Sequence, residues 1–228
     1  MKINELKKTY EGRLVLNIQE TEIPDGKIIA VIGTNGSGKS TFAKILCGII
    51  KADEKTKPFE IKGTDEIKKG KNAGKYAVGY LPQKPYAFNM SVEKNLNIAG
   101  EAGDEICSRL KIDHLKNENA KKLSGGENAR MALGRILAKK FDLLILDEPT
   151  ASMDIETTLS AEELVREYSE RTGATVLIIT HELKQARRVS DFVMFFDKGE
   201  IVSAGETNKT LDDPSDERLK EFIRFYGA

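Results

Sequence analysis

The run "GTNGSGKST" at residues 33–41 has the residue types and the spacing of a phosphate-binding loop. Its three glycines let backbone N–H groups curl around phosphate oxygens without clashes from side chains. We expect Lys39 to reach the β- and γ-phosphates of a nucleotide and the Ser40 hydroxyl to ligate Mg²⁺. An apolar strand pattern before the run and a helical pattern after it distinguish it from a chance glycine-rich turn. The candidate cofactor-binding residues of this loop are Gly33, Thr34, Asn35, Gly36, Ser37, Gly38, Lys39, Ser40 and Thr41.

Two adjacent carboxylates follow a second apolar run, "FDLLILDE" at residues 141–148. A buried strand there would deliver Asp147 at its carboxyl end, where the carboxylate can hold Mg²⁺ through water. Glu148 is then placed to polarise an attacking water as a general base. His181 ends a third apolar run, "LIITHE", and strand ends on this side of an α/β sheet line the ligand crevice. We therefore interpret Glu148 and His181 as catalytic rather than as ordinary strand ends.

A second anion-binding pattern lies in "KLSGGENARMALGR" at residues 122–135. Ser124, Gly125 and Gly126 precede a helix-prone run, so several N–H groups are free at the positive end of a helix. The bland alternative is a helix start that contains glycine and binds no ligand. The pattern raises the question of why one chain would hold two phosphate sites.

The order of the elements predicts the fold class. Alternating polar and apolar residues up to Ile23 indicate antiparallel strands, and helical spacing runs through 91–122. Elsewhere, buried-type strands alternate with helices, which predicts an α/β fold with a mostly parallel sheet flanked by helices on both faces. The expected strands are "KIIAVIG", "YAVGYLPQ", "FDLLILDE", "ATVLIIT" and "DFVMFFD"; the expected helices are 39–50, 157–172, 182–190 and an amphipathic closing helix in "DPSDERLKEFIRFYGA".

Composition limits the class of protein. The 228 residues contain 36 Lys and Arg and 36 Asp and Glu, so no bulk charge draws the chain to nucleic acid or anionic lipid. Segment 51–75 mixes lysines with acids and is expected to form a solvated surface hairpin region. Cys47 and Cys107 lack metal-type spacing and are expected to be buried thiols in a reducing compartment.

Hydrophobic segments are short throughout. The opening "MKINELKKTYEG" lacks the apolar segment of a secretory leader. The apolar runs "IIAVIG" and "ILCGII" are far shorter than the roughly 20 residues that a membrane span needs. We expect a cytoplasmic chain that does not itself cross a bilayer.

Taken in chain order, the motifs resemble those of the ATP-binding cassette ATPases. The phosphate loop, "YLPQ" with Gln83, "LSGGE" at 123–127, "LLILDEP" and "THE" follow the order and approximate spacing of that family over essentially the whole chain. The resemblance implies a P-loop NTPase fold with an N-terminal antiparallel β subdomain. It also implies a single ATPase domain, 1–228, with a short inserted helical subdomain, 84–126, that faces a membrane partner.

The resemblance also assigns roles to single residues. Tyr10 resembles the aromatic residue that stacks on adenine. Gln83 resembles the glutamine that contacts Mg²⁺ and water and senses the γ-phosphate. Glu148 and His181 match the catalytic glutamate and the switch histidine, and Asp154 in "ASMD" resembles the aspartate that contacts the partner across a dimer.

In the same family pattern, Ser124, Gly125, Gly126 and Glu127 form the signature sequence, with Glu127 where a glutamine is more usual. We predict that this helix end caps the nucleotide held by the Lys39 loop of a second copy, in a head-to-tail, ATP-dependent homodimer. The second phosphate site then serves the partner.

The function that follows is ATP hydrolysis, with ATP and Mg²⁺, coupled to solute uptake through separate transmembrane permease subunits. The chain is most similar to bacterial importer ATPases of the phosphate and tungstate type, which implies an oxyanion cargo, an extracytoplasmic solute-binding protein and a position on the inner face of the cell membrane. The alternative is a soluble cassette ATPase acting on nucleic acid or the ribosome. Repair relatives insert a long coiled coil and ribosome-acting relatives usually carry two cassettes, and this chain has neither. A module that has lost catalysis is disfavoured by the intact Lys39, Glu148 and His181.

Overall fold

The computed structural model of the chain describes residues 1–228 except 54–56, 62–75, 101 and 228. Its centre is a six-stranded sheet of described residues, in which β10, β5, β9, β8 and β7 run parallel and β11 is an antiparallel edge strand. All side chains of β5, β8 and β9 are buried, as expected for strands covered on both faces. In spatial order the strands are β11 (Glu200–Glu206), β10 (Phe192–Asp197), β5 (Ile28–Gly33), β9 (Thr175–Ile179), β8 (Leu143–Asp147) and β7 (Val78–Leu81).

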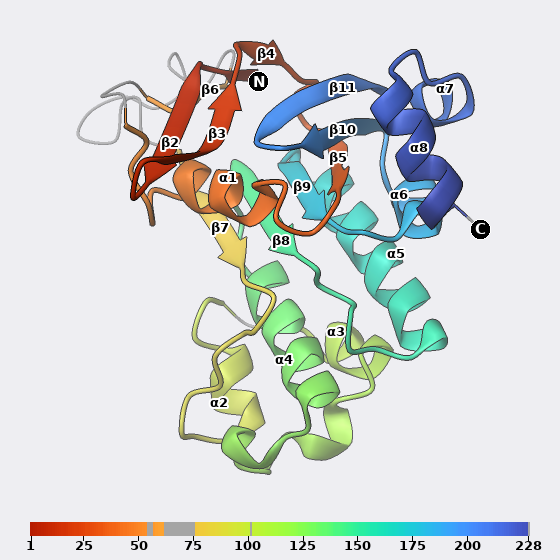
Figure 1. The fold of residues 1–228 in the computed structure, drawn as a ribbon. Coiled ribbons are helices and arrows are strands. Elements are labelled where there is room, and N and C mark those ends of the chain that lie inside the picture. Colours follow the sequence, from red (N-terminus) through yellow and green to blue (C-terminus); the bar gives the residue numbers. More distant parts are fainter. Residues whose placement is uncertain (54–56, 62–75, 101, 228) are drawn as a thin grey trace.

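Alternation along the strands divides the core into two faces. Ile29 and Val31 of β5 pack with Phe42 of α1 (Lys39–Leu46) on one face. Ala30 and Ile32 pack on the other face, against α6 (Leu183–Val189), α7 (Thr207–Asp212) and the closing helix α8 (Glu217–Tyr226). Helix α5 (Ile155–Thr172) covers the same second face under β8 and β9 (Figure 1). The predicted mostly parallel sheet with helices on both faces is confirmed.

The N-terminal strands are antiparallel and lie over α1. Strands β1 (Lys2–Ile3), β4 (Thr21–Glu22) and β6 (Phe59–Glu60) form a small sheet. Strands β2 (Leu6–Tyr10) and β3 (Arg13–Ile18) form a hairpin. Glu11 and Gly12 at its tip both have positive φ, the backbone that a two-residue hairpin turn requires. The predicted antiparallel N-terminal region is confirmed.

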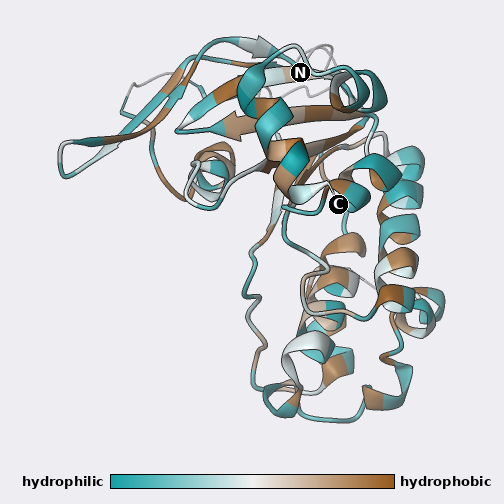
Figure 2. Ribbon diagram, turned by 45° about the vertical axis from the view of Figure 1, so that its right-hand side comes forward, coloured by the Kyte–Doolittle hydropathy of each residue, from teal (hydrophilic) through white to brown (hydrophobic). Residues whose placement is uncertain are grey.

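A group of short helices extends from the sheet and gives the molecule an L-shaped outline (Figure 2). It holds α2 (Val92–Leu96), α3 (Asp104–Arg109), 3₁₀ turns at Asp113–Leu115 and Ala120–Lys122, and the longer α4 (Gly125–Leu137). Buried Leu96, Leu110 and Met131 join these helices to the core under β8. The boundary of a helical subdomain at 84–126 stays a prediction, and α4 begins inside that segment and continues to Leu137.

Several local expectations were wrong. The helix predicted over 39–50 ends at Leu46, because Gly48 takes the left-handed conformation that terminates helices. The helical pattern predicted through 91–122 is confirmed as short pieces, α2, α3 and two 3₁₀ turns, and Ser91 bridges to Asn119. Strand β11 and helix α7 were not predicted.

Other expectations concern the lysine-rich segment and the thiols. Most of the hairpin region expected at 51–75 lies outside the described residues, and Phe59–Glu60 within it forms β6. Both cysteines are free thiols; Cys107 is buried and Cys47 is partly buried at the end of α1. Among the described residues, none of the helices is both long and apolar enough to span a membrane.

Gly199, in the turn between β10 and β11, ties the N-terminal strands to the phosphate loop. Its N–H donates to Ser37 O at 3.0 Å, and its carbonyl accepts from Asn17 N–H at 2.8 Å. Its φ is +87°, and a Cβ there would lie 2.4 Å from Val15 O. We expect Gly199→Ala to lower the free energy of unfolding by about 3 kcal/mol, measured by denaturant titration without nucleotide.

The matched control is Gly48→Ala, because Gly48 also has positive φ, +71°, but a Cβ there would meet nothing within 4 Å. Only the left-handed backbone penalty, about 1 kcal/mol, applies at that position. Equal losses in the two variants would show that the close approach of Val15 O adds nothing.

Candidate active site

The phosphate loop lies between β5 and α1, as its sequence context requires. Gly38 has a φ of +103°, and a Cβ on Gly33 would lie 2.1 Å from Phe196 O, so both positions need glycine. The Lys39 ammonium donates to Gly33 O and Thr34 O, each at 2.8 Å, and lies 3.3 Å from Ser37 Oγ. Burial lowers the pKa of Lys39, while the nearby Glu148 and Asp147 carboxylates oppose that shift. The ammonium thus lies across the loop, on a flexible stem that can turn toward bound phosphates.

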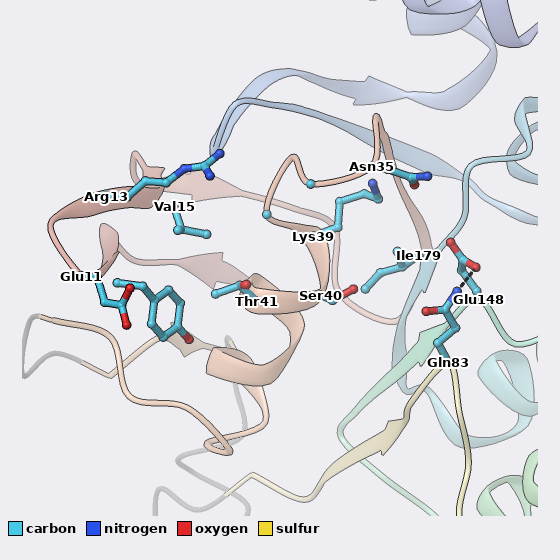
Figure 3. A pocket seen from close by; sticks show the side chains of 13 residues that line it. Glu11, Arg13, Val15, Asn35, Lys39, Ser40, Thr41, Gln83, Glu148 and Ile179 are labelled. Atoms are coloured by element: carbon cyan, nitrogen blue, oxygen red, sulfur yellow. Dashed lines mark hydrogen bonds between the residues drawn. The ribbon is translucent and has the colours of Figure 1, made fainter.

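A cavity of about 780 Å³ opens beside this loop (Figure 3). Tyr10 and Arg13, which are cross-strand partners in the β2–β3 hairpin, form its far wall. The Tyr10 side chain is partly exposed, at 43%, so its ring is available to a planar ligand. The lining residues are Tyr10, Glu11, Arg13, Val15, Asn35, Gly36, Gly38, Lys39, Ser40, Thr41, Gln83, Glu148 and Ile179.

Asp147, at the carboxyl end of β8, is buried and accepts a hydrogen bond from the neighbouring strand. Burial raises its pKa, and hydrogen bonds from the Ser40 hydroxyl and the Tyr80 phenol oppose that shift. The Tyr80 hydroxyl lies 3.1 Å from Asp147 Oδ2. The described residues contain no cluster of three or more His, Cys, Asp or Glu side chains that could hold a metal alone. One hydroxyl and one carboxylate beside a phosphate loop suit a hard cation that takes its remaining ligands from phosphate and water.

Glu148 brings two other predicted residues together. Its Oε2 accepts from Gln83 Nε2 at 2.6 Å, and its Oε1 lies 3.2 Å from His181 Nδ1. Its φ of 50° is left-handed, a conformation that costs a non-glycine residue about 1–2 kcal/mol. The Glu148 N–H bonds to Ile179 O at 2.9 Å, which anchors the strained backbone to the end of β9. The carboxylate therefore points into the space beside the phosphate loop (Figure 3).

A smaller cavity of about 290 Å³ adjoins this carboxylate. Gly33, Thr34 and Asn35 of the phosphate loop line it together with Gln83, Glu148 and His181. Tyr226, near the end of α8, completes its wall. This is the space in which a water molecule could approach a terminal phosphate.

The signature residues lie elsewhere. Ser124 caps α4: its Oγ accepts from Glu127 N–H at 3.3 Å, and Glu127 Oε2 accepts from Ser124 N–H at 2.7 Å, a reciprocal capping box. These bonds lower the pKa of Glu127. None of the described residues from Ser124 to Glu127 lines the cavity beside Lys39, and α4 begins at the end of the helices far from α1 (Figure 1).

The signature and the "ASMD" loop are nevertheless neighbours. A Cβ on Gly126 would lie 2.6 Å from Ser152 O, so the close approach of the two backbones requires glycine. Asp154, two residues on, caps α5 by accepting from Thr157 N–H at 2.8 Å and from Thr157 Oγ1 at 3.0 Å. These bonds lower the pKa of Asp154. Ser124, Gly125, Gly126, Glu127 and Asp154 thus form a surface separate from the site around Lys39.

Some residues of the site were missed from the sequence. Arg13 and Glu11 enter the site through the geometry of the hairpin turn, for which "YEGR" was the available signal. Tyr80 shares a sheet face with Asp147 because β7 pairs with β8, which strand alternation alone does not reveal. Tyr226 lies far away in the chain, and no local pattern pointed to it.

Comparisons with known proteins agree with this geometry. Residues 16–151 match the family described as ABC transporter. The chain is 36% identical over 213 residues to the tungstate uptake system ATP-binding protein TupC of Peptoclostridium acidaminophilum, covering 89% of this chain and 96% of that protein. It is 31% identical to the phosphate import ATP-binding protein PstB 1 of Nostoc sp., covering 98% of this chain and 95% of that protein. The predicted resemblance to importer ATPases of this type is confirmed.

Among solved structures, the fold matches a dimeric post-hydrolysis state of the ATP-binding cassette MJ0796 bound to ADP and Pi. The TM-score is 0.73 at 21% identity, covering 90% of this chain and 98% of that one. The geometry of the site agrees with the family that the sequence matches. It has a phosphate loop, with Asp147 and Glu148 adjacent at the end of β8. The chain belongs to the ABC transporter family and is a nucleotide-binding ATPase of that family.

Proposed function

We propose that this chain is the ATP-hydrolysing subunit of an importer, working as a head-to-tail homodimer on separate transmembrane permease subunits at the cytoplasmic face of the membrane. The observation that carries its catalytic part is the Glu148 carboxylate, held between Gln83 and His181 beside the Lys39 loop. The tungstate uptake and phosphate import relatives support uptake, and an oxyanion as the cargo.

Nucleotide binding begins with the phosphate loop and the β2–β3 hairpin. Tyr10 stacks on the adenine ring, and the Lys39 ammonium leaves its contacts with Gly33 O and Thr34 O to reach the β- and γ-phosphates. Ser40 and Gln83 would ligate Mg²⁺ and Asp147 would hold it through water, and the cation would neutralise charge on the phosphates. The Ser40 hydroxyl opposes the rise in the pKa of the Asp147 carboxylate, which supports pairing the two residues at this site.

Hydrolysis then rests on Glu148. A water oxygen attacks the γ-phosphorus, the bond to the β–γ bridging oxygen breaks, and the water proton passes to the Glu148 carboxylate as ADP and phosphate form. His181 and Gln83 hold that carboxylate from its two sides and orient it toward the small cavity. The strained φ of Glu148 aims the side chain, as strain at a functional residue commonly does.

The dimer explains the separate signature surface. Ser124 Oγ accepts one bond within α4 and keeps its O–H to donate, and a Cβ on Gly125 would meet nothing within 4 Å. The helix start can therefore face a γ-phosphate held by the partner copy, with the α4 dipole behind it. Asp154 lies on the neighbouring loop and contacts the partner as well.

The alternative is a soluble ATPase acting on nucleic acid or the ribosome. The equal numbers of basic and acidic residues give no electrostatic support for nucleic acid binding.

A solute-binding protein outside the membrane completes the proposed importer.

Cells that depend on this chain should lose uptake of one oxyanion when the Lys39→Ala variant replaces the parent protein. Without the Lys39 ammonium, the site lacks the cation that binds the phosphates and cannot bind ATP. Tungstate uptake is measured by metal analysis of washed cells and phosphate uptake with a radioactive tracer. A matched control is Lys44→Ala, on the same helix and outside the residues that line the nucleotide cavity. Normal uptake of both anions with a changed ribosome profile would favour the alternative.

A further inference from the structure

Tyr80 reaches the metal-binding carboxylate from the neighbouring strand. In the parallel β7–β8 pair, Tyr80 is opposite Ile145. Side chains two residues apart on a strand share a face, so Asp147 projects on the same side of the sheet as Ile145 and Tyr80. The Tyr80 hydroxyl closes the remaining gap and lies 3.1 Å from Asp147 Oδ2.

The contact restrains a buried carboxylate. The Ser40 hydroxyl, from α1, opposes the rise in the pKa of the same carboxylate. Asp147 is 4% exposed, so water contributes little to holding it. A hydrogen bond from the Tyr80 phenol to this buried carboxylate limits the orientations that the carboxylate can adopt.

We propose that Tyr80 is a positioning residue for magnesium: its phenol holds Asp147 in the orientation that binds the cation together with the nucleotide. The inference rests on the magnesium site proposed above. With Ser40 among the residues that would hold Mg²⁺, the Tyr80 phenol would be the donor that restrains the Asp147 carboxylate. Hydrogen-bond partners of the groups that hold a metal typically change metal affinity by about 10–100-fold when they are lost.

The test is Tyr80→Phe, which removes only the hydroxyl. The affinity for a fluorescent ADP analogue is measured by titration in excess EDTA and again in excess Mg²⁺. The ratio of the two dissociation constants gives the gain that magnesium adds. We expect the variant to bind the analogue in EDTA like the parent. The ratio of its dissociation constants in EDTA and in Mg²⁺ should be about 10-fold smaller than that of the parent.

Tyr168→Phe is the matched control. The Tyr168 side chain is buried, and its hydroxyl makes two backbone bonds, accepting from Phe141 N–H and donating to Lys139 O, each at 3.0 Å. Both backbone partners precede the start of β8, at the opposite end of that strand from Asp147. Loss of the Tyr168 hydroxyl is expected to lower thermal stability without changing the gain in affinity that magnesium adds.

The outcomes distinguish the proposed magnesium site from the proposed role of Tyr80 at that site. A parent protein with no gain from magnesium would overturn the metal site and, with it, the role of Tyr80. A normal gain in the parent that Tyr80→Phe retains in full would overturn the role of Tyr80 alone. Equal losses in Tyr80→Phe and Tyr168→Phe would assign the effect to general destabilisation and also overturn it.

Discussion

Replacing Glu148 by glutamine should leave nucleotide binding intact while lowering the rate of ATP hydrolysis by about 10²–10⁴, the range for losing general-base help. The amide keeps the size and shape of the side chain but cannot take a proton from water. The backbone at Glu148 keeps its bond to Ile179 O, so the variant should fold like the parent. Steady-state phosphate release and equilibrium binding of ATP measure the two quantities.

The same variant should accumulate an ATP-bound dimer. If ATP joins two copies and hydrolysis releases them, a chain that binds without hydrolysing remains paired, and size exclusion with ATP should show the dimer. Glu182→Gln is the matched control, because Glu182 is an exposed carboxylate next to His181 whose side chain makes no capping bond. Near-normal turnover in Glu148→Gln would show that another residue acts as the general base, with His181 as the next candidate.

The sequence predicted the sheet and the phosphate loop because both are local signals. The strands β5, β8 and β9 are continuous apolar runs, and a strand buried on both faces needs no other pattern. The loop at 33–41 depends on glycine geometry within nine residues. The helix pattern at 39–50 failed at its end, because Gly48 and not hydrophobic spacing decides where α1 stops.

The convergence at Glu148 was not a local signal. Gln83 follows β7 and His181 follows β9, and these strands lie on the two sides of β8. Strand order is set by packing between distant segments, so the residues alone placed Glu148 and His181 at strand ends without showing their contact. The resemblance to a family supplied the roles of Gln83 and Tyr10, and distances came only from the structure.

Residues outside any motif were the ones missed. Strand β11, "EIVSAGE", lies at the sheet edge with partly exposed side chains, so it carries neither a buried run nor a clean alternation. Arg13 became a cavity residue because two positive φ values at Glu11 and Gly12 place it opposite Tyr10. Such effects depend on tertiary pairing, which residue types alone do not determine.

Two inactive variants should restore activity when mixed. Lys39→Ala removes the cation that binds the β- and γ-phosphates, and Ser124→Arg places a bulky side chain at the start of α4, so each homodimer has two defective sites. A mixed dimer pairs the intact Lys39 loop of one copy with the intact Ser124 of the other and keeps one whole site. Because a two-fold dimer has two equivalent sites, we expect about half the ATPase of a normal dimer for each mixed dimer, or less if the sites are coupled.

Ser108→Arg is the matched control, because it makes the same exchange at an exposed position of α3 away from the α4 N-terminus. It should be active alone. Mixed dimers are isolated with two different affinity tags, and phosphate release is measured with saturating ATP and Mg²⁺. Full activity of Ser124→Arg alone would exclude a role for Ser124 toward the partner's nucleotide. Mixed dimers that form but stay inactive would contradict independent composite sites, because the one site that joins an intact loop to an intact helix start would then be insufficient for hydrolysis.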